Sequence, residues 1–136
     1  PKVVVGSVAV SGERVLLCRR AIEPRLGFWT LPAGFLEMGE TAENGALREA
    51  LEEANAELAI EGLLGVFSIA RIGQVQIIFR ARLLDPDAIR PTAESSEVGL
   101  FGWEEIPWRD LAFPSVRWAL TTWRSETAPR SAGVPE

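Results

Sequence analysis

The sequence predicts a single α/β domain in which an acidic helix lies between two sets of strands and a second helix follows them. Three observations lead to this prediction. The length of 136 residues and the hydrophobic fraction of 47% suit one globular domain with its own core. Alternating or β-branched apolar segments lie on both sides of a run of helix-forming residues. No repeat or linker divides the chain.

Two strands are expected near the start of the chain. They are VVVGSVAV, residues 3–10, and RVLLCRR, residues 14–20, joined by a tight turn at Ser11-Gly12. In the second strand, Val15 and Leu17 should face one side and Leu16 and Cys18 the other. Residues 21–35 carry two prolines and two glycines, which predicts an ordered loop with short extended pieces.

The acidic helix is expected from Thr41 to Ala54. The Thr41 side chain can cap its N-terminus, and Asn55 tolerates the left-handed conformation that ends a helix. Gly45 is unfavourable inside a helix by roughly 1 kcal/mol relative to Ala. A glycine there indicates that another segment packs closely against the helix backbone.

Three strands and a last helix complete the expected domain. The strands lie within residues 57–71, 74–84 and 98–106. Ser115 should cap the helix, whose apolar residues are Val116, Trp118, Ala119, Leu120 and Trp123. We place the domain at residues 1–124 and expect a mobile polar tail at 125–136.

Composition excludes several classes of function. The chain has no histidine and a single cysteine, which removes histidine bases, Ser-His and Cys-His nucleophiles, and multi-cysteine zinc sites. A pI near 4.9 argues against nucleic acid as a partner. No apolar run is long enough for a membrane span and no signal peptide opens the chain, so we expect a cytoplasmic protein without a membrane partner.

Negative charge is concentrated in the acidic helix and the loop before it. Residues 37–53 contain six glutamates and one arginine, a net charge of −5 that equals that of the whole chain. On a helix Glu49, Glu52 and Glu53 share one arc, with Leu47, Ala50, Leu51 and Ala54 expected to be buried on the opposite side. A solvated acidic face is one interpretation. The other is a site for a divalent cation, which would remove the repulsion between the carboxylates.

The spacing of these residues resembles the Nudix box, G-x5-E-x7-R-E-U-x-E-E-x-G-U, where U is a bulky aliphatic residue. The matching positions are Gly34, Glu40, Arg48, Glu49, Glu52 and Glu53. Asn55 and Ala56 replace the last glycine and aliphatic residue. The resemblance covers roughly residues 2–123 and is strongest to the branch that contains FAD diphosphatases and ADP-ribose pyrophosphatases.

The resemblance implies a fold and an activity. The fold is an α/β/α sandwich around a central mixed sheet. The activity is hydrolysis of a nucleoside diphosphate linked to another moiety, with Mg²⁺ as the cofactor and Mn²⁺ as its alternative. The other functions to consider are a house-cleaning nucleoside triphosphate pyrophosphatase and a Nudix module that binds a nucleotide without cutting it. Relatives in this branch are commonly homodimers, and five Trp and six Phe leave aromatic surface to cover.

The resemblance also implies roles for individual residues. The metal ligands are the backbone carbonyl of Ala33 and the carboxylates of Glu49, Glu52 and Glu53, with Arg48 orienting the glutamates and Glu40 as its partner. Glu97 corresponds to a late acidic residue that serves as metal ligand or general base, and Glu94 competes for that role.

Substrate contacts are predicted from side-chain chemistry. Arg20 and Arg71 can bind phosphate oxygens, although arginines on strands often only face solvent. Phe28 and Trp29 can stack on a base or can pack within their loop. Gln76, with Gln74, is a candidate for reading polar groups of the substrate, while the remaining tryptophans are expected in the core or in a dimer interface.

Overall fold

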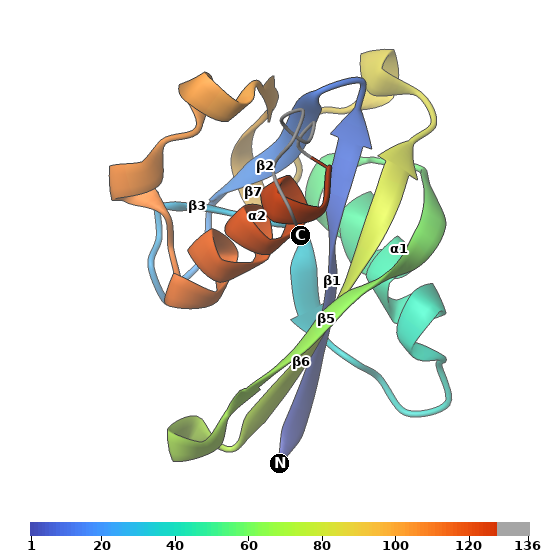
Figure 1. The fold of residues 1–136 in the computed structure, drawn as a ribbon, viewed down its shortest axis with the longest axis vertical. Coiled ribbons are helices and arrows are strands. Elements are labelled where there is room, and N and C mark those ends of the chain that lie inside the picture. The colour runs from blue at the N-terminus through green and yellow to red at the C-terminus, as the bar shows by residue number, and fades with distance from the viewer. Residues whose placement is uncertain (128–136) are drawn as a thin grey trace, which may run out of the picture.

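A computed structural model describes residues 1–127 of the chain (Figure 1). Seven strands form one sheet, and two α-helices and four short 3-10 turns accompany it. The strands are β1 (Lys2–Ser11), β2 (Arg14–Arg20), β3 (Trp29–Thr30), β4 (Ala33–Phe35), β5 (Leu58–Ile69), β6 (Gln74–Leu83) and β7 (Ser95–Phe101). The helices are α1 (Ala42–Ala54) and α2 (Pro114–Thr127), and the 3-10 turns are η1 (Ala70–Ile72), η2 (Pro86–Ala88), η3 (Trp103–Glu105) and η4 (Trp108–Asp110).

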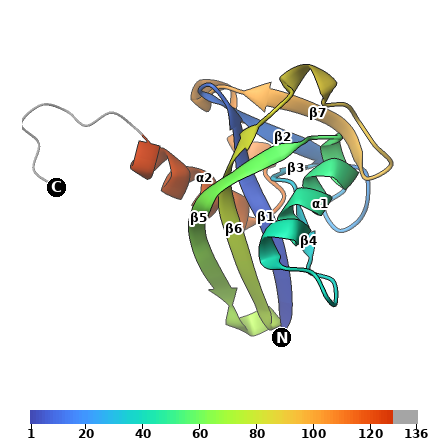
Figure 2. The same ribbon diagram turned by 90° about the vertical axis from the view of Figure 1, so that its right-hand side faces the viewer.

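The sheet is mixed, as expected. Its strand order is β3-β2-β1-β6-β5, with β4 paired to β1 and β7 paired to β2. Strands β1 and β6 run parallel, whereas the other pairs are antiparallel. The two helices lie on opposite faces of this sheet (Figures 1 and 2). The α/β/α sandwich is therefore confirmed.

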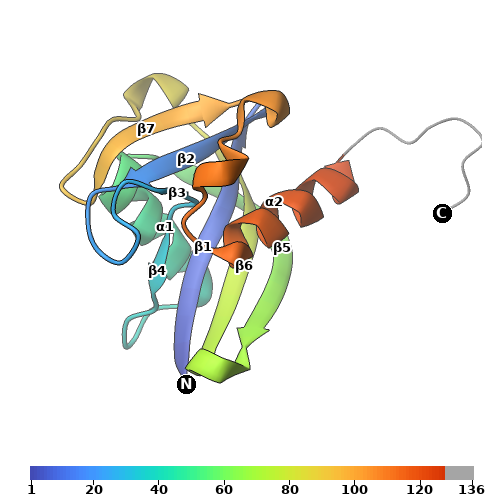
Figure 3. The same ribbon diagram turned by 90° about the vertical axis from the view of Figure 1, so that its left-hand side faces the viewer.

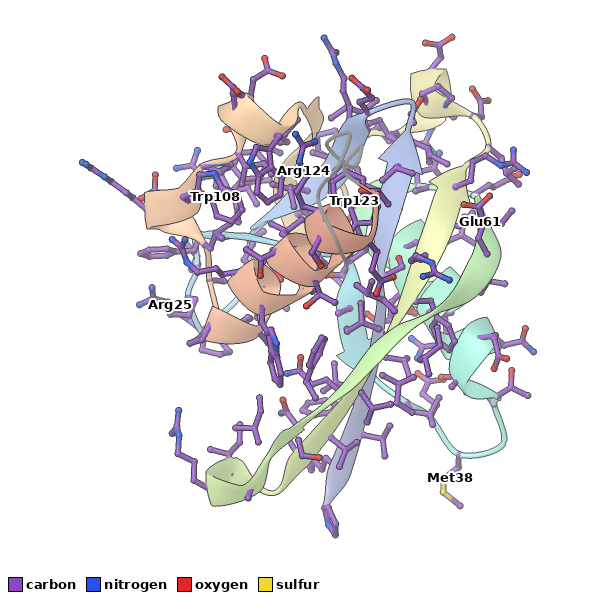
Figure 4. The ribbon with its side chains drawn as sticks, viewed as in Figure 1. Arg25, Met38, Glu61, Trp108, Trp123 and Arg124 are labelled. Carbon is purple, nitrogen blue, oxygen red and sulfur yellow. The ribbon has the colours of Figure 1, made fainter. Side chains whose placement is uncertain are left out.

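Alternation along β2 divides the core between the two helices. Val15 and Leu17 pack with Val116 and Leu120 of α2, while Leu16 and Cys18 pack with small residues of α1. Because successive side chains of a strand point to opposite faces, one strand serves both layers. The aromatic side chain of Trp123 extends the α2 layer (Figure 4) and is 7% exposed.

Both ends of α1 follow the local signals in the sequence. The N–H of Asn44 donates to Thr41 Oγ1 at 3.1 Å, which confirms the N-terminal cap. Asn55 has φ 52° and ψ 37°, the left-handed conformation; its N–H donates to the carbonyl of Leu51, and the N–H of Ala56 donates to that of Ala50. These two ends fix which turn of the helix carries each glutamate.

The second helix begins earlier than expected. Its first residue is Pro114, so Ser115 lies inside the helix and does not precede it as a cap. Proline suits the first helical position because the N–H that it lacks would have no partner there. The helix continues through residues 125–127 (Figure 3), and the rest of the expected tail, residues 128–136, lies outside the described residues. Within residues 1–127, neither helix is long and apolar enough to cross a membrane.

Close packing explains the glycine inside α1. A Cβ built at Gly45 would lie 2.8 Å from Leu36 Cδ1 and 2.9 Å from Val5 Cγ2. Both distances are shorter than side chains tolerate, so β1 and the chain after β4 approach the helix backbone at this point. The loop that follows β4 has Met38, which is fully exposed, at its outer end (Figure 4).

We expect Gly45→Ala to lower the free energy of unfolding by about 1 kcal/mol. Overpacking typically costs about 1–3 kcal/mol, which outweighs the gain of roughly 1 kcal/mol in helix propensity. Urea denaturation measures the change. Asn44→Ala, at an exposed position of the same helix, is the control and should be neutral or slightly stabilising. Equal stabilisation by both substitutions would contradict the close approach.

Candidate active site

Two carboxylates of α1 lie buried against the short strand β4. Glu49 and Glu53 are one helical turn apart and only 8% and 7% exposed. The N–H of Ala33 donates to Glu53 Oε2 at 2.9 Å. Gly34 leaves the space that the Glu49 carboxylate fills, since a Cβ there would overlap its oxygens. Strand β4 thus positions both glutamates through its backbone.

The buried face of α1 differs from the expected one. Ala50 and Ala54 are fully buried, as predicted, but Leu51 is 47% exposed, so its predicted burial was wrong. The buried residues include Glu49 and Glu53, because β4 lies against the acidic arc of the helix while other strands of the sheet cover the alanines. Glu52 stays exposed at the edge of that arc.

Arg48 connects the box carboxylates to one another. Its Nε and Nη2 donate to the two oxygens of Glu40 at 3.0 and 2.7 Å, and Nη2 also reaches the carbonyl of Phe35. Its Nη1 donates to Glu49 at 2.8 Å and to Glu52 at 3.1 Å. The expected pair of Arg48 with Glu40 is present, and the same side chain also bonds two of the glutamates that it was expected to orient. A planar guanidinium suits this task because its donors point in fixed directions.

Electrostatics separate the carboxylates of this cluster. The hydrogen bonds from Arg48 lower the pKa of Glu40 to about 2. Burial raises the pKa of Glu53, and the neighbouring Glu49 raises it further. Burial also raises the pKa of Glu94, with the negative charges of Glu49 and Glu52 adding to the effect. The cluster therefore contains two carboxyl groups whose ionisation is disfavoured, those of Glu53 and Glu94, and one whose ionisation is favoured, that of Glu40.

Of the two late acidic residues, Glu94 is the one connected to the acidic helix, because the Thr92 hydroxyl bonds both the N–H of Glu94 and the carbonyl of Glu53. The charges of Glu49 and Glu52 act on it, and its Oε2 is buried without a hydrogen-bond partner among the described residues. The carboxylate of Glu97 instead accepts a hydrogen bond from Arg19 at 2.8 Å and is more than half exposed. The pairing of β7 with β2 sets Glu97 directly opposite Arg19.

The donor atoms suit a hard divalent cation. Carboxylate oxygens and a backbone carbonyl are the ligands that Mg²⁺ and Mn²⁺ prefer, and the unpartnered Oε2 of Glu94 is one such atom. Within residues 1–127, however, no three acidic side chains are already arranged around one point. Arg48 holds Glu49 and Glu52, and Ala33 holds Glu53. Cation binding thus requires carboxylates to exchange these partners for the metal.

An open pocket of about 690 Å³ lies beside the cluster and shares β4 with it. Ala33 and Gly34 line the pocket and also contact the buried carboxylates. Its polar lining includes Arg20, Arg71, Gln74 and Gln76. Two aromatic residues also line the pocket, Phe113 just before α2 and Trp118 within it. The volume lies in the range of small-molecule sites, about 300–1,000 Å³.

The pocket includes three of the five predicted substrate residues. Arg20 and Arg71 line it, and so does Gln76, whose Nε2 donates to Gln74 Oε1 at 2.8 Å. Phe28 and Trp29 are not among the lining residues. Trp29 packs edge-on against Phe101, and Phe28 stacks under the guanidinium of Arg25. In this structure both aromatic side chains therefore pack against other residues of the protein, which was the second interpretation of their role.

Trp118 is a pocket residue that the sequence reasoning missed. It is 49% exposed and its ring lies 3.8 Å from that of Phe67, between centroids. Helical spacing contained the signal. At 100° per residue, Val116, Leu120 and Trp123 form one stripe and Trp118 lies roughly 150° away from it. It could therefore have been separated from the buried set.

Comparison with known proteins connects this geometry to a family. The NUDIX domain model matches residues 1–123. The MutT-like protein of Streptomyces ambofaciens is 34% identical over 114 residues, which cover 84% of this chain and 71% of that protein. The ADP-ribose pyrophosphatase of Methanocaldococcus jannaschii is 38% identical over 68 residues, which cover 50% of this chain and 40% of that protein.

A solved structure resembles the whole described domain. The crystal structure of a NUDIX hydrolase from Nitrosomonas europaea has a TM-score of 0.89 and 48% sequence identity to this chain. The match covers 96% of this chain and 75% of that one.

Burial of the Glu53 carboxyl predicts a pH-dependent stability in the absence of metal. Its pKa is raised in the folded state, so the stabilisation by the neutral carboxyl is complete below the unfolded pKa, about 4.3. It is lost as the pH rises through the folded value. A glutamine amide at this position can still accept the N–H of Ala33 but carries no charge. We therefore expect Glu53→Gln to melt higher than wild type in EDTA, by a margin that grows above pH 5.

Thermal melting by circular dichroism from pH 4.5 to 9 measures this margin. Glu57→Gln, which removes an exposed charge outside the cluster, is the control. A margin that stays constant across the pH range would contradict the raised pKa.

Proposed function

This chain belongs to the NUDIX family, and we propose that it is a metal-dependent pyrophosphohydrolase for a nucleoside diphosphate joined to a second group, of the FAD or ADP-ribose class. Membership makes the protein a hydrolase that acts on phosphoric anhydrides. The observation that carries the finer proposal is the position of β4 between the buried carboxylates and the pocket. A pyrophosphate bound in the pocket along β4 would lie beside the box glutamates.

The proposed metal ligands are Glu49, Glu52 and Glu53 with the carbonyl of Ala33. When bound, a divalent cation neutralises charge on the pyrophosphate and lowers the pKa of the attacking water. Arg48 keeps the ligand carboxylates oriented through the bidentate pair that it makes with Glu40. Arg20 and Arg71, at the wall of the pocket, are placed to bind phosphate oxygens.

We assign the general base to Glu94. Its Oε2 is buried without a hydrogen-bond partner within residues 1–127, and burial together with the charges of Glu49 and Glu52 raises its pKa toward the range where a base works at neutral pH. Glu94 would take the proton of the water that attacks phosphorus. Glu97, engaged with Arg19, is the less suitable candidate.

The second group of the substrate is proposed to lie near Trp118. This exposed indole and Phe113 form the aromatic side of the pocket, while Gln74 and Gln76 offer amide groups to polar edges of a ring. The name of the M. jannaschii relative, an ADP-ribose pyrophosphatase, supports this substrate class. Cleavage would yield AMP and a phosphorylated remainder, such as ribose 5-phosphate from ADP-ribose or FMN from FAD.

Two alternatives differ from this proposal in specific features. A house-cleaning triphosphate pyrophosphatase would use the same carboxylates with a different pocket preference. A nucleotide-sensing module would not need the carboxylates, and the presence of Glu49, Glu52 and Glu53 favours catalysis.

We also propose that the protein is a cytoplasmic homodimer. Leu63 and Val66 on the outer strand β5 are about half exposed and offer apolar surface, and light scattering at micromolar concentration would test the assembly.

Turnover should depend on a divalent metal and on Glu53. We expect EDTA to abolish hydrolysis of ADP-ribose or FAD, and excess Mg²⁺ or Mn²⁺ to restore it. Glu53→Gln should lower kcat by at least about 100-fold because a ligand charge is lost while the fold remains. Assays of AMP formation at saturating metal measure both effects, with Glu57→Gln as the unchanged control. Full activity after chelation would refute the metal mechanism.

Substrate choice should follow the aromatic side of the pocket. We expect kcat/KM for ADP-ribose or FAD to exceed that for 8-oxo-dGTP, and NADH completes the panel. Trp118→Leu should raise KM about two- to tenfold with less effect on kcat, because stacking adds about 0.5–1.5 kcal/mol. Trp118→Phe keeps a ring and should retain most of the affinity. A kcat/KM for 8-oxo-dGTP that is tenfold higher than for every dinucleotide would contradict this substrate class and favour a house-cleaning triphosphate pyrophosphatase.

A further inference from the structure

The C-terminal end of α1 is tied to the segment that leads to Glu94. Three hydrogen bonds make this connection within five residues of the segment. They run from Asn55 Nδ2 to the carbonyl of Ala88 at 3.0 Å, from the N–H of Arg90 to the carbonyl of Ala54 at 3.0 Å, and from Thr92 Oγ1 to the carbonyl of Glu53 at 3.2 Å. We call these three bonds the helix clip.

The helix clip continues directly to Glu94. The N–H of Glu94 donates to Thr92 Oγ1 at 3.2 Å, so one hydroxyl joins the backbone of Glu53 to that of Glu94. The carbonyl of Glu94 accepts the N–H of Ala21 at 3.0 Å, which fixes the other side of the residue. The backbone of Glu94, which lies just before β7, is therefore held through α1 as well as through Ala21.

Asn55 occupies the position where the Nudix box has glycine. Its φ of 52° is a conformation that glycine adopts at least as easily, so ending the helix does not require an asparagine. What asparagine adds is the amide that donates to Ala88. That carbonyl belongs to η2, at the start of the segment that carries Thr92 and Glu94.

We propose that Asn55 is a positioning residue, which acts through the helix clip to hold Glu94 over the carboxylates of α1. The inference rests on the proposed function, because it concerns where Glu94 stands relative to the metal ligands. This role would account for the asparagine at the position where the box has glycine. The chain replaces a glycine, which only relaxes the backbone, with a side chain that links the helix to the late acidic residue.

Asn55→Gly tests this role because it keeps the backbone geometry and deletes the amide. Although Glu94 is assigned as the base, its negative charge adds to that of Glu49 and Glu52 and so also attracts a cation that they hold. We therefore expect the variant to bind Mn²⁺ about tenfold more weakly than wild type, the lower end of the loss typical of outer groups at metal sites. Isothermal titration calorimetry with Mn²⁺ alone, without substrate, measures the affinity. The melting temperature of the variant in EDTA reports separately on the role of Asn55 in ending the helix. We expect this temperature to change little.

A double substitution shows whether the effect passes through Glu94. In a Glu94→Gln background, Asn55→Gly should cause no further loss of Mn²⁺ affinity, because the residue that the clip positions no longer carries a charge. Thr92→Val removes the shared hydroxyl and should weaken binding as Asn55→Gly does, while Thr92→Ser should retain it. A purely structural role for Asn55 predicts equal losses in both backgrounds.

The outcomes separate this inference from the proposed function. Wild type that binds Mn²⁺ and turns over substrate, together with an Asn55→Gly variant of equal Mn²⁺ affinity, would overturn the inference and leave the function standing. A loss that is the same with and without the Glu94 carboxylate would also overturn it. Wild type that binds no Mn²⁺ and hydrolyses none of the substrates would remove the proposed function, and the inference with it.

Discussion

The carboxylates of Glu49 and Glu53 lie side by side in the interior of the domain, and the rest of the site depends on containing their repulsion. Burial of two like charges is costly unless each finds donors or remains neutral. Here Arg48 supplies donors to Glu49, the N–H of Ala33 serves Glu53, and the pKa of Glu53 rises. Keeping two buried carboxylates together lowers the stability of the fold, which is the compromise that functional sites commonly make.

Strand β4 is the element that makes this arrangement useful. It is three residues long, pairs only with the start of β1, and lies between α1 and the pocket. Its backbone serves both sides at once, with Ala33 donating to a carboxylate and Gly34 leaving room for another. Close packing at Gly45 brings α1 near enough to β1 for this to occur. Two glycines thus set the distance between α1 and the pocket.

The site also depends on groups that approach α1 from elsewhere in the chain. Arg48 is fixed by Glu40 from the loop before the helix, and the helix clip adds contacts from the segment after β6. Each connection reaches a backbone carbonyl or a charged partner, so each restrains direction as well as distance. Side chains held by such outer contacts are the ones whose positions a metal site can rely on.

The sequence by itself determined the elements whose signals are local. The Thr41 cap, the left-handed Asn55 and the alternation along β2 each depend on neighbouring residues, and so the helix, its ends and the two faces of the strand could be predicted. The spacing from Gly34 to Glu53 likewise resembled the Nudix box, and helical geometry places Glu49, Glu52 and Glu53 on one arc wherever the helix lies.

Tertiary structure alone decided which residues meet across the chain. From the sequence, Glu94 and Glu97 were competing candidates. The register of β7 against β2 pairs Glu97 with Arg19, while the Thr92 hydroxyl connects the backbone of Glu94 to the end of α1. The tertiary structure also decided that α1 buries Glu49 and Glu53 and exposes Leu51. The periodicity of a helix shows which residues share a face, but it does not show what covers that face. β4 covers it, and the pairing of β4 with β1 is a long-range contact without a local signal.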